Sequence, residues 1–409
     1  MHGQGHESGA DYLKTTSWKV QSVFALEGAP FVLNESIADQ QTYCEHIDGL
    51  RGIAILMVMA VHSGILAQQL QHSSFRFQAS ANLLDSGARG VQLFFILSAF
   101  TLFHSSLRRF RIDAKPKTSF YIRRAFRILP FWWLAVLFYG VVTHAQLRNA
   151  FPSLFFYFGF IRFDATREIV PGGWSLFVEE TFYLFLPFIL AYVTSLGRAF
   201  RFFLGTLFIG VLWFKFAARI GVPSENSFIA LSPLTNWFCF ALGIIAYYIF
   251  KEKRPLRLLP DDAAPHWLDA GLVVLVLALV VNRFAAPFAL FALTLAAENP
   301  SRPIGRIMRN KWLKRYGQYC YSLYLSHFAL LLAMQYPLQY VCRRWLSTPL
   351  PTEAMFLVVY SALLGVALAT GFVFFNYIER PCVDLGKKLT RAINRRGTAA
   401  SALAIPKAG

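Results

Sequence analysis

The sequence predicts an all-α protein, a polytopic bundle of about ten transmembrane helices with both termini in the cytoplasm. Hydrophobic residues make up 56% of the chain and charged residues only 15%, which leaves too little polar surface to cover a water-soluble core. Apolar runs of about 20 residues recur along the sequence, and a helix of that length crosses a bilayer. Basic residues gather in the short loops between these runs, which is the distribution that orients a membrane protein.

The same distribution argues against other classes of protein. A net charge of +18 would suggest nucleic-acid binding in a soluble protein, but here the basic loops explain the charge, and we expect no nucleic-acid partner. The five cysteines are scattered without a Cys-x-x-Cys pair, so we predict neither a disulfide framework nor a metal site.

Three regions are predicted along the chain. Residues 1–44 are mixed and polar and hold no apolar signal-peptide core, so we expect a poorly ordered cytoplasmic tail there. Residues 45–385 are expected to form the membrane-embedded core. Residues 386–409 are expected to form a basic cytoplasmic C-terminal tail.

The apolar runs are interpreted as spans in chain order. They cover residues 49–69, 89–107, 128–146, 174–195, 201–219, 228–250, 267–282, 284–298, 319–341 and 356–378. A further stretch, 150–161, is too short to cross a bilayer comfortably. If 150–161 does not cross, the basic loop from Arg108 to Arg127 and all later basic clusters lie in the cytoplasm. We therefore expect a re-entrant or interfacial segment there, with an additional span as the alternative.

The first span carries two ionisable residues on one face. Residues 46–52 include an Asp48-Gly49 pair that predicts a loop leading into the helix. Arg51 and His62 are eleven residues apart, which places them on nearly the same face and about 16 Å apart along the axis. A buried imidazole can act as a general base. A histidine that only bridges two helices is the alternative.

The basic segment 121–130 lies where the cytoplasm is expected to meet the membrane. Arg124 and Arg127 are three residues apart and share a helix face if the segment is helical. Their guanidinium groups could bind phosphates, with membrane orientation and lipid contact as the alternative. For Arg108, Arg109 and Arg111 we prefer that second interpretation.

A polar stripe opens the span at 174–195. Ser175, Glu179 and Tyr183 follow i, i+4 spacing and should share one helix face. The Glu179 carboxylate could bind sugar hydroxyls or orient a base, and a salt bridge to a neighbouring arginine is the alternative. Two further segments bury polar groups. Residues 316–327 hold tyrosines, serines and His327, and residues 376–381 are expected to close the last helix, with Glu379 as a structural ion-pair partner.

Six motifs occur in an order that resembles a known family. They are LRGIA with Arg51 ahead of His62, then GVQLFFILSAF, RRAFRILP, WSLFVEETFYLFLP, YSLYLSH and IERP. Together, from about residue 45 to 385, they resemble the integral-membrane acyltransferase 3 family, which includes O-antigen, peptidoglycan and Nod-factor O-acetyltransferases. The chain departs from the family pattern at Leu97-Ser98-Ala99-Phe100, where LSGF is usual, and at Cys320-Tyr321, where SY is usual.

The resemblance implies an enzyme of the bacterial inner membrane, an acyltransferase that transfers groups other than amino-acyl groups. The donor would be cytoplasmic acyl-CoA, usually acetyl-CoA, acting as a co-substrate with no permanently bound cofactor. The acceptor would be a hydroxyl of a surface or secreted carbohydrate, so the implied role is polysaccharide modification by O-acetylation. The expected partners are the lipid bilayer, acyl-CoA and the carbohydrate. This chain lacks the hydrolase-like domain that is fused to some members, so if the reaction needs a second protein, that periplasmic partner would be separate.

The resemblance also implies residue roles. His62 would be the general base or a transient acyl carrier, and Arg51 and Glu179 would be catalytic with it. The arginines that would hold the CoA phosphates are Arg51, Arg124 and Arg127. The residues that would bind the acceptor are Trp174, Ser175, Glu179, Tyr324 and His327.

Two other functions remain open from the sequence. A transporter or flippase for a glycan or lipid-linked intermediate could use the buried polar line, although it would favour broken helices paired between two halves, and no such halves are evident. A non-catalytic assembly or sensing protein is the second alternative.

Overall fold

A computed structural model describes residues 32–145, 147–160, 168–220, 222, 228–252, 266–345 and 349–403. Backbone contacts divide the chain into two units, Met1–Thr42 and Tyr43–Gly409. Every regular element in the described ranges is a helix, and these ranges contain no strand. The prediction of an all-α fold is therefore confirmed.

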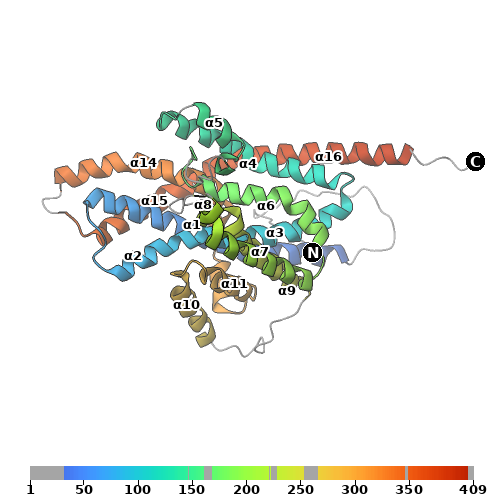
Figure 1. The fold of residues 1–409 in the computed structure, drawn as a ribbon, viewed down its shortest axis with the longest axis horizontal. Coiled ribbons are helices and arrows are strands. Elements are labelled where there is room, and N and C mark those ends of the chain that lie inside the picture. The colour runs from blue at the N-terminus through green and yellow to red at the C-terminus, as the bar shows by residue number, and fades with distance from the viewer. Residues whose placement is uncertain are drawn as a thin grey trace, which may run out of the picture. The chain divides into compact units, whose positions relative to one another are not determined.

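Figure 1 shows the helices in chain order from blue to red. The longer ones are α1 (Val32–Gln71), α3 (Gly90–Ile112), α4 (Pro116–Val142), α6 (Gly173–Tyr192), α7 (Leu196–Phe216), α9 (Pro233–Lys251), α10 (His266–Val280), α11 (Ala286–Ala296), α14 (Cys320–Trp345), α15 (Thr352–Phe374) and α16 (Arg380–Leu403). The shorter ones are α2 (Gln78–Asp85), η1 (Ser86–Arg89), α5 (Leu147–Leu154), η2 (Phe158–Phe160), η3 (Ala217–Ile220), α8 (Phe228–Leu231), α12 (Pro303–Met308), α13 (Lys311–Gln318) and the π-helical turn η4 (Phe375–Glu379).

Many of these helices are suited to a bilayer. Seven described stretches are long and apolar enough to cross a membrane, namely Glu45–Gln71, Gln78–Ile112, Pro116–Val142, Gly173–Tyr192, Leu196–Phe216, Phe228–Lys251 and Thr352–Arg395. Two other predicted spans are shorter apolar helices, Leu268–Val280 and Ala286–Ala296, and the remaining one lies in α14. The chain is thus a multi-pass membrane protein, while the number of about ten spans and the cytoplasmic termini stay predictions.

The stretch 150–161 does not form a long helix. Its regular part consists of the end of α5, a helix of eight residues, and the turn η2. Eight residues rise only about 12 Å, against a hydrocarbon core of about 30 Å. The segment is fastened to α4 instead, because the Trp132 indole donates to the Ser153 carbonyl oxygen at 2.7 Å and stacks on Phe156. This agrees with a segment that does not cross as a helix.

The loop predicted at residues 46–52 is wrong, because α1 runs through it without a break. The Asp48 carboxylate pairs with Arg51 one turn later, at 3.4 Å. Gly49 permits a close helix contact, since a Cβ there would lie 1.7 Å from the carbonyl oxygen of Met308. Gly52 does the same against Leu313, at 2.1 Å. The glycines therefore bring α1 against α12 and α13, and packing overrides the local turn signal.

The end predicted for the last helix at residues 376–381 is also wrong. The chain passes from α15 through η4 into α16, which continues to Leu403. Pro381 cannot donate a backbone hydrogen bond to the preceding turn, and a π-helical turn widens the helix where the proline ring would otherwise clash. Glu379 lies in that turn, buried, and accepts a hydrogen bond from Ser322 at 3.0 Å.

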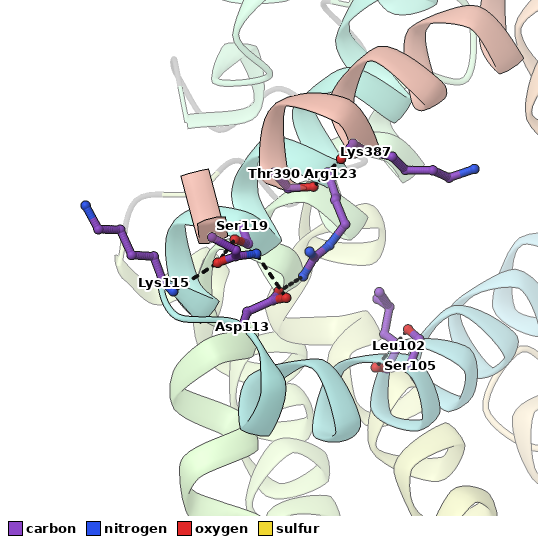
Figure 2. A network of polar contacts seen from close by, with 9 residues as sticks. Leu102, Ser105, Asp113, Lys115, Ser119, Arg123, Lys387 and Thr390 are labelled. Carbon is purple, nitrogen blue, oxygen red and sulfur yellow. Dashed lines mark hydrogen bonds and ion pairs between the residues drawn. The ribbon is translucent and has the colours of Figure 1, made fainter. Parts of the chain in front are cut away.

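Helix α16 lies alongside α4 (Figure 1). The contact is close at Gly386, where a Cβ would lie 2.7 Å from the Cβ atom of Phe126. A polar network extends it (Figure 2), in which Asp113 accepts from the Asn394 amide at 3.1 Å and pairs with Arg123 at 2.9 Å. The predicted tail 386–409 begins inside this helix.

The domain boundaries themselves stay predictions. Residues 1–31 and 404–409, which belong to the two predicted tails, lie outside the described residues.

Candidate functional site

One cavity of about 410 Å³ lies where α1, α3, α4, α6 and α14 meet. These helices each contribute a short polar or charged stretch to its wall, although most of each helix is apolar. The described residues that line it are Ile47, Asp48, Arg51, Val91, Phe94, Phe95, Ser98, Phe100, Thr101, Leu102, His104, Ser105, Arg109, Arg124, Arg127, Ile128, Ser175, Leu176, Glu179, Tyr183, Cys320, Tyr321 and Tyr324.

Four of the described lining residues are arginines, which we call the basic end of the cavity: Arg51, Arg109, Arg124 and Arg127, from α1, α3 and α4. Each lies toward the cytoplasmic end predicted for its own helix. Arg51 is held by two partners, the Asp48 carboxylate and the Thr101 hydroxyl, which lies 2.9 Å from its Nη2 atom. Both partners also line the cavity, so the position of this guanidinium is fixed with respect to the cavity.

Arg124 and Arg127 share one face of α4, as predicted from their spacing, and both line the cavity. The Arg124 guanidinium lies over the rings of Phe120 and Tyr183, at 6.0 and 5.5 Å from their centroids. Its Nε atom is buried, and no hydrogen-bond partner for it exists in the described part of the chain. Arg127 interacts electrostatically with the buried Glu379 carboxylate. The pair therefore places cationic donors beside the cavity.

Arg109 differs from the interpretation of its loop. The sequence favoured lipid-headgroup contact for Arg108, Arg109 and Arg111, but Arg109 lines the cavity. Its neighbour Arg108 is exposed and is absent from the described lining. The reason is helical rotation, since adjacent residues of α3 point about 100° apart.

The polar stripe of α6 faces the same cavity. Glu179 accepts hydrogen bonds from the Ser98 hydroxyl, at 2.5 Å, and from the Tyr183 hydroxyl. Ser175 shares a hydrogen bond of 2.6 Å with the Tyr324 hydroxyl. The i, i+4 prediction that these α6 side chains share a face is confirmed by the geometry. Glu180, one residue further on, does not belong to the described lining.

Tyr324 joins α14 to the start of α6 in the cavity wall. Its hydroxyl donates to the Gly172 carbonyl oxygen at 2.9 Å. Gly172 has φ of 79°, a left-handed conformation that a glycine adopts without strain, and it turns the chain into α6. A Cβ at Gly172 would also lie 3.1 Å from the Tyr324 hydroxyl oxygen. The turn thus fixes the wall on which Ser175 and Tyr324 meet.

His62 lies outside the described lining of this cavity. It is half-buried, and its Nδ1 atom lies 3.2 Å from Nε2 of the buried His327. The ring of Phe328 packs on both imidazoles, with centroid distances of 4.3 Å to each. Trp174 also lies outside the described lining, and its ring packs edge-on against Phe95. The predicted site residues therefore form two groups, one around the cavity and one at the histidine pair.

The sequence reasoning missed several lining residues, among them Ser98, Thr101 and Cys320. Ser98 and Thr101 are three apart in the otherwise apolar motif of α3, and that helical spacing is the signal that could have identified them. Cys320 was noted only as a departure from the family pattern, yet it lines the cavity too. Nothing in its local sequence distinguishes it from a buried structural cysteine.

Comparison with known proteins gives the family. A family model described as an acyltransferase domain matches residues 45–375. The chain belongs to the acyltransferase 3 family. The matched segment contains the arginines of the basic end, the α6 stripe and both histidines of the pair.

The relatives are distant but extend over most of this chain. A Staphylococcus aureus (strain MRSA252) protein named as an O-acetyltransferase is 24% identical over 87% of this chain and 59% of its own length. A Komagataeibacter xylinus protein named as a membrane-bound transacylase is 24% identical over 86% of each chain. The peptidoglycan O-acetyltransferase of Listeria monocytogenes is 23% identical over 71% of this chain and 49% of its own length. No solved structure matches the chain.

The chain therefore spans 59% of the length of the Staphylococcus relative. What those longer proteins do as a whole is carried over to this chain only as a proposal.

Proposed function

We propose that this protein is an O-acyltransferase of the bacterial inner membrane. It transfers an acyl group, acetyl in the simplest case, from cytoplasmic acyl-CoA to a hydroxyl of a surface or secreted carbohydrate. The observation that carries the proposal is the cavity, in which arginines from α1, α3 and α4 and the Glu179 carboxylate from α6 face one space. Family membership supports acyl transfer as the reaction.

The basic end suits the phosphates of acyl-CoA. Guanidinium groups bind phosphate oxygens through charge-assisted and often bidentate hydrogen bonds. Arg51, Arg124 and Arg127 come from two helices and line the same cavity, so a phosphate there could contact more than one of them. This arrangement requires the basic end to face the cytoplasm, as the charge distribution predicts.

The hydroxyl-lined wall suits a sugar. Ser175, Tyr324 and Glu179 present hydroxyl and carboxylate oxygens within one stretch of the cavity wall, and these groups exchange hydrogen bonds with sugar hydroxyls. The Listeria relative is named for peptidoglycan, a glycan polymer, which supports a carbohydrate acceptor. Trp174 lies on the same helix, one residue before Ser175, where its indole could contact a sugar ring outside the described lining.

His62 lies beside the cavity, bonded to His327, which is bonded in turn to the carbonyl oxygen of the lining residue Tyr324. It acts in one of two ways. As a general base, its ring nitrogen takes the proton of the acceptor hydroxyl while the oxygen attacks the thioester carbonyl. The carbon–sulfur bond then breaks and CoA leaves as a thiolate, which is protonated. As a carrier, the ring nitrogen itself attacks the carbonyl, the carbon–sulfur bond breaks, and CoA leaves as a thiolate from the acyl-imidazolium. The acceptor oxygen then attacks this acyl group, the carbon–nitrogen bond breaks to restore the neutral imidazole, and the hydroxyl proton neutralises the thiolate.

The test is acetyl-CoA turnover by the purified protein in proteoliposomes. The acceptor is a surface-glycan extract from cells that lack this protein, and CoA release and glycan O-acetyl content are both measured. We expect turnover in the native protein and its loss in His62→Ala and Arg51→Ala. The controls His72→Asn and Arg108→Ala change exposed residues of the same types and should turn over normally. Full activity in His62→Ala would overturn the proposal.

A further inference from the structure

The two histidines form a hydrogen-bonded chain that begins at the backbone. Nδ1 of His327 lies 2.7 Å from the carbonyl oxygen of Tyr324 and 3.1 Å from that of Leu323. A carbonyl oxygen can only accept a hydrogen bond, so Nδ1 of His327 carries a proton. The His327 side chain is fully buried in the helix bundle, where a neutral imidazole is favoured over a charged one. A neutral ring has a single N–H, and Nε2 of His327 is therefore an acceptor.

This acceptor fixes the protonation of the second ring. Nε2 of His327 faces Nδ1 of His62 at 3.2 Å. Because the first nitrogen accepts, the second must donate, and the proton of neutral His62 lies on Nδ1. The lone pair of His62 is then on Nε2. The hydrogen bonds therefore all point one way: His62 donates to His327, and His327 donates to the backbone carbonyls.

We infer that His327 is a positioning residue that holds His62 in the tautomer whose Nε2 atom reacts. The inference rests on the proposed function and applies to both roles of His62, because a base and an acyl carrier each need the unprotonated nitrogen to face the substrates. A partner that selects the reacting nitrogen of a catalytic histidine acts in the same way in other acyl-transferring enzymes.

The surroundings of the pair hold this arrangement. The Phe328 ring packs against both imidazoles, which restricts rotation of either ring out of the chain. His62 is half-buried whereas His327 is fully buried, so only the outer member of the pair has an accessible edge. With its Nδ1 bonded to His327, the ring nitrogen left for a substrate is Nε2.

The geometry also argues against direct binding of the acceptor by His327. One of its nitrogens is bonded to backbone carbonyls and the other to His62. No ring nitrogen is left for a sugar hydroxyl. Tyr324 connects the pair to the cavity instead, because its carbonyl accepts from His327 while its hydroxyl lies in the cavity wall.

Two substitutions of His327 test the inference. His327→Gln keeps an acceptor oxygen near the position of Nε2, whereas His327→Met has a similar volume and no strong acceptor. In proteoliposomes with acetyl-CoA and the glycan extract, we expect kcat of His327→Met to fall about 100-fold with both KM values unchanged. His327→Gln should recover much of that loss. Equal losses in the two variants, or a raised glycan KM with a normal kcat, would overturn the inference.

A methylated histidine tests which nitrogen of His62 reacts. Nδ1-methylhistidine is placed at position 62 in a His327→Gly background, which makes room for the methyl group, and is compared with unmodified His62 in that background. Because the methyl group leaves Nε2 as the unprotonated nitrogen, as His327 does in the native protein, we expect kcat of the methylated protein to equal or exceed that of the unmodified one. Loss of turnover on methylation, with unchanged elution from a sizing column, would show that Nδ1 reacts and that the inference is wrong.

The two proposals fail in different ways. If the native protein released no more CoA than His62→Ala does, the proposed acyltransferase activity would be wrong. Normal turnover in the native protein together with an unimpaired His327→Met would leave the enzyme in place and remove only the role of His327.

Discussion

Helix α1 contributes to both the basic end of the cavity and the histidine pair. The two regions differ in whether their polar atoms have hydrogen-bond partners. Arg51 anchors the first and His62 belongs to the second, about 16 Å further along the helix axis. At the basic end, Arg124 has a donor without a partner in the described part of the chain. At the pair, both nitrogens of His327 are bonded. Open donors suit a ligand that binds and leaves, whereas a closed chain suits a proton that must stay in place.

The two regions avoid the cost of placing charged groups inside a bilayer in different ways. A guanidinium inside a bilayer is costly unless anions or accessible water accompany it. The basic end has carboxylates from three helices, Asp48, Glu179 and Glu379, close to its arginines. The histidine pair needs no counter-ion because neutral rings satisfy one another. The difference predicts that substitutions at the two regions change different kinetic constants.

The largest effect is expected from His62→Ala, which removes the reacting nitrogen and leaves the basic end intact. We expect kcat to fall at least about 100-fold, because general-base or covalent catalysis by the ring is lost. CoA affinity, measured by equilibrium dialysis in detergent, should stay within about twofold of the native value. A large loss of CoA affinity in this variant would break the separation between the two regions.

The next effect is expected from Arg127→Lys, which keeps the charge but removes the planar fork that binds phosphate through two hydrogen bonds. We expect CoA affinity to weaken about 10-fold, which is about 1.4 kcal/mol, with little change in kcat at saturating acetyl-CoA. The remaining binding should weaken further as salt is added, because the attraction is electrostatic. The comparison would fail if kcat fell and affinity did not.

Arg109 and Arg108 offer a smaller and closely matched test. Both residues are exposed, but only Arg109 belongs to the described lining of the cavity. We expect Arg109→Ala to raise the KM for acetyl-CoA about threefold, as for a partly solvated charge contact, and Arg108→Ala to leave it unchanged. Equal effects of the two substitutions would return Arg109 to the lipid-facing role that its loop suggested.

The sequence indicated that Arg124 and Arg127 lie together, but it did not indicate that His62 and His327 do. The reason is the separation of the contacting residues along the sequence. Arg124 and Arg127 share a face because of spacing within one helix, which a sequence displays directly. His62 and His327 are separated by 265 positions, and their pairing depends on the relative rotation and depth of α1 and α14. No local pattern encodes that register, so the sequence placed His327 with the acceptor rather than beside His62.

Local signals were also misleading where helices pack closely. The Asp48-Gly49 pair is typical of a turn, but Gly49 lies at a backbone contact between α1 and α12, and packing there keeps the helix continuous. Likewise, Pro381 suggested a helix end, but the π-helical turn before it lets α15 pass into α16. In both cases a long-range or neighbouring arrangement, absent from the local sequence, decides the outcome.

The smallest effect is expected at the contact between α16 and α4, which supports the helix that carries Arg124 and Arg127. The Asn394 side chain donates to Asp113 at 3.1 Å and accepts from the backbone N–H of Lys115 at 3.2 Å. Its Oδ1 atom also accepts from the Ser119 hydroxyl at 3.4 Å. Asn394→Ala removes all three bonds, and because they are partly exposed we expect a loss of about 1 kcal/mol. The midpoint of thermal unfolding in detergent should fall by about 2 °C.

The activity of this variant should show whether α16 only stabilises α4 or also sets the geometry of the basic end. Asn376→Ala is the matched control, because the amide of this half-buried residue donates to the Phe372 carbonyl oxygen one turn earlier, at the junction of α15 and η4. If α16 merely supports α4, Asn394→Ala lowers the unfolding temperature and leaves the acetyl-CoA KM within about twofold of the native value. If the KM rises as far as in Arg127→Lys while kcat is kept, the docking of α16 sets the geometry of the basic end. The basic end would then depend on a distant contact as strongly as the histidine pair depends on its neighbours.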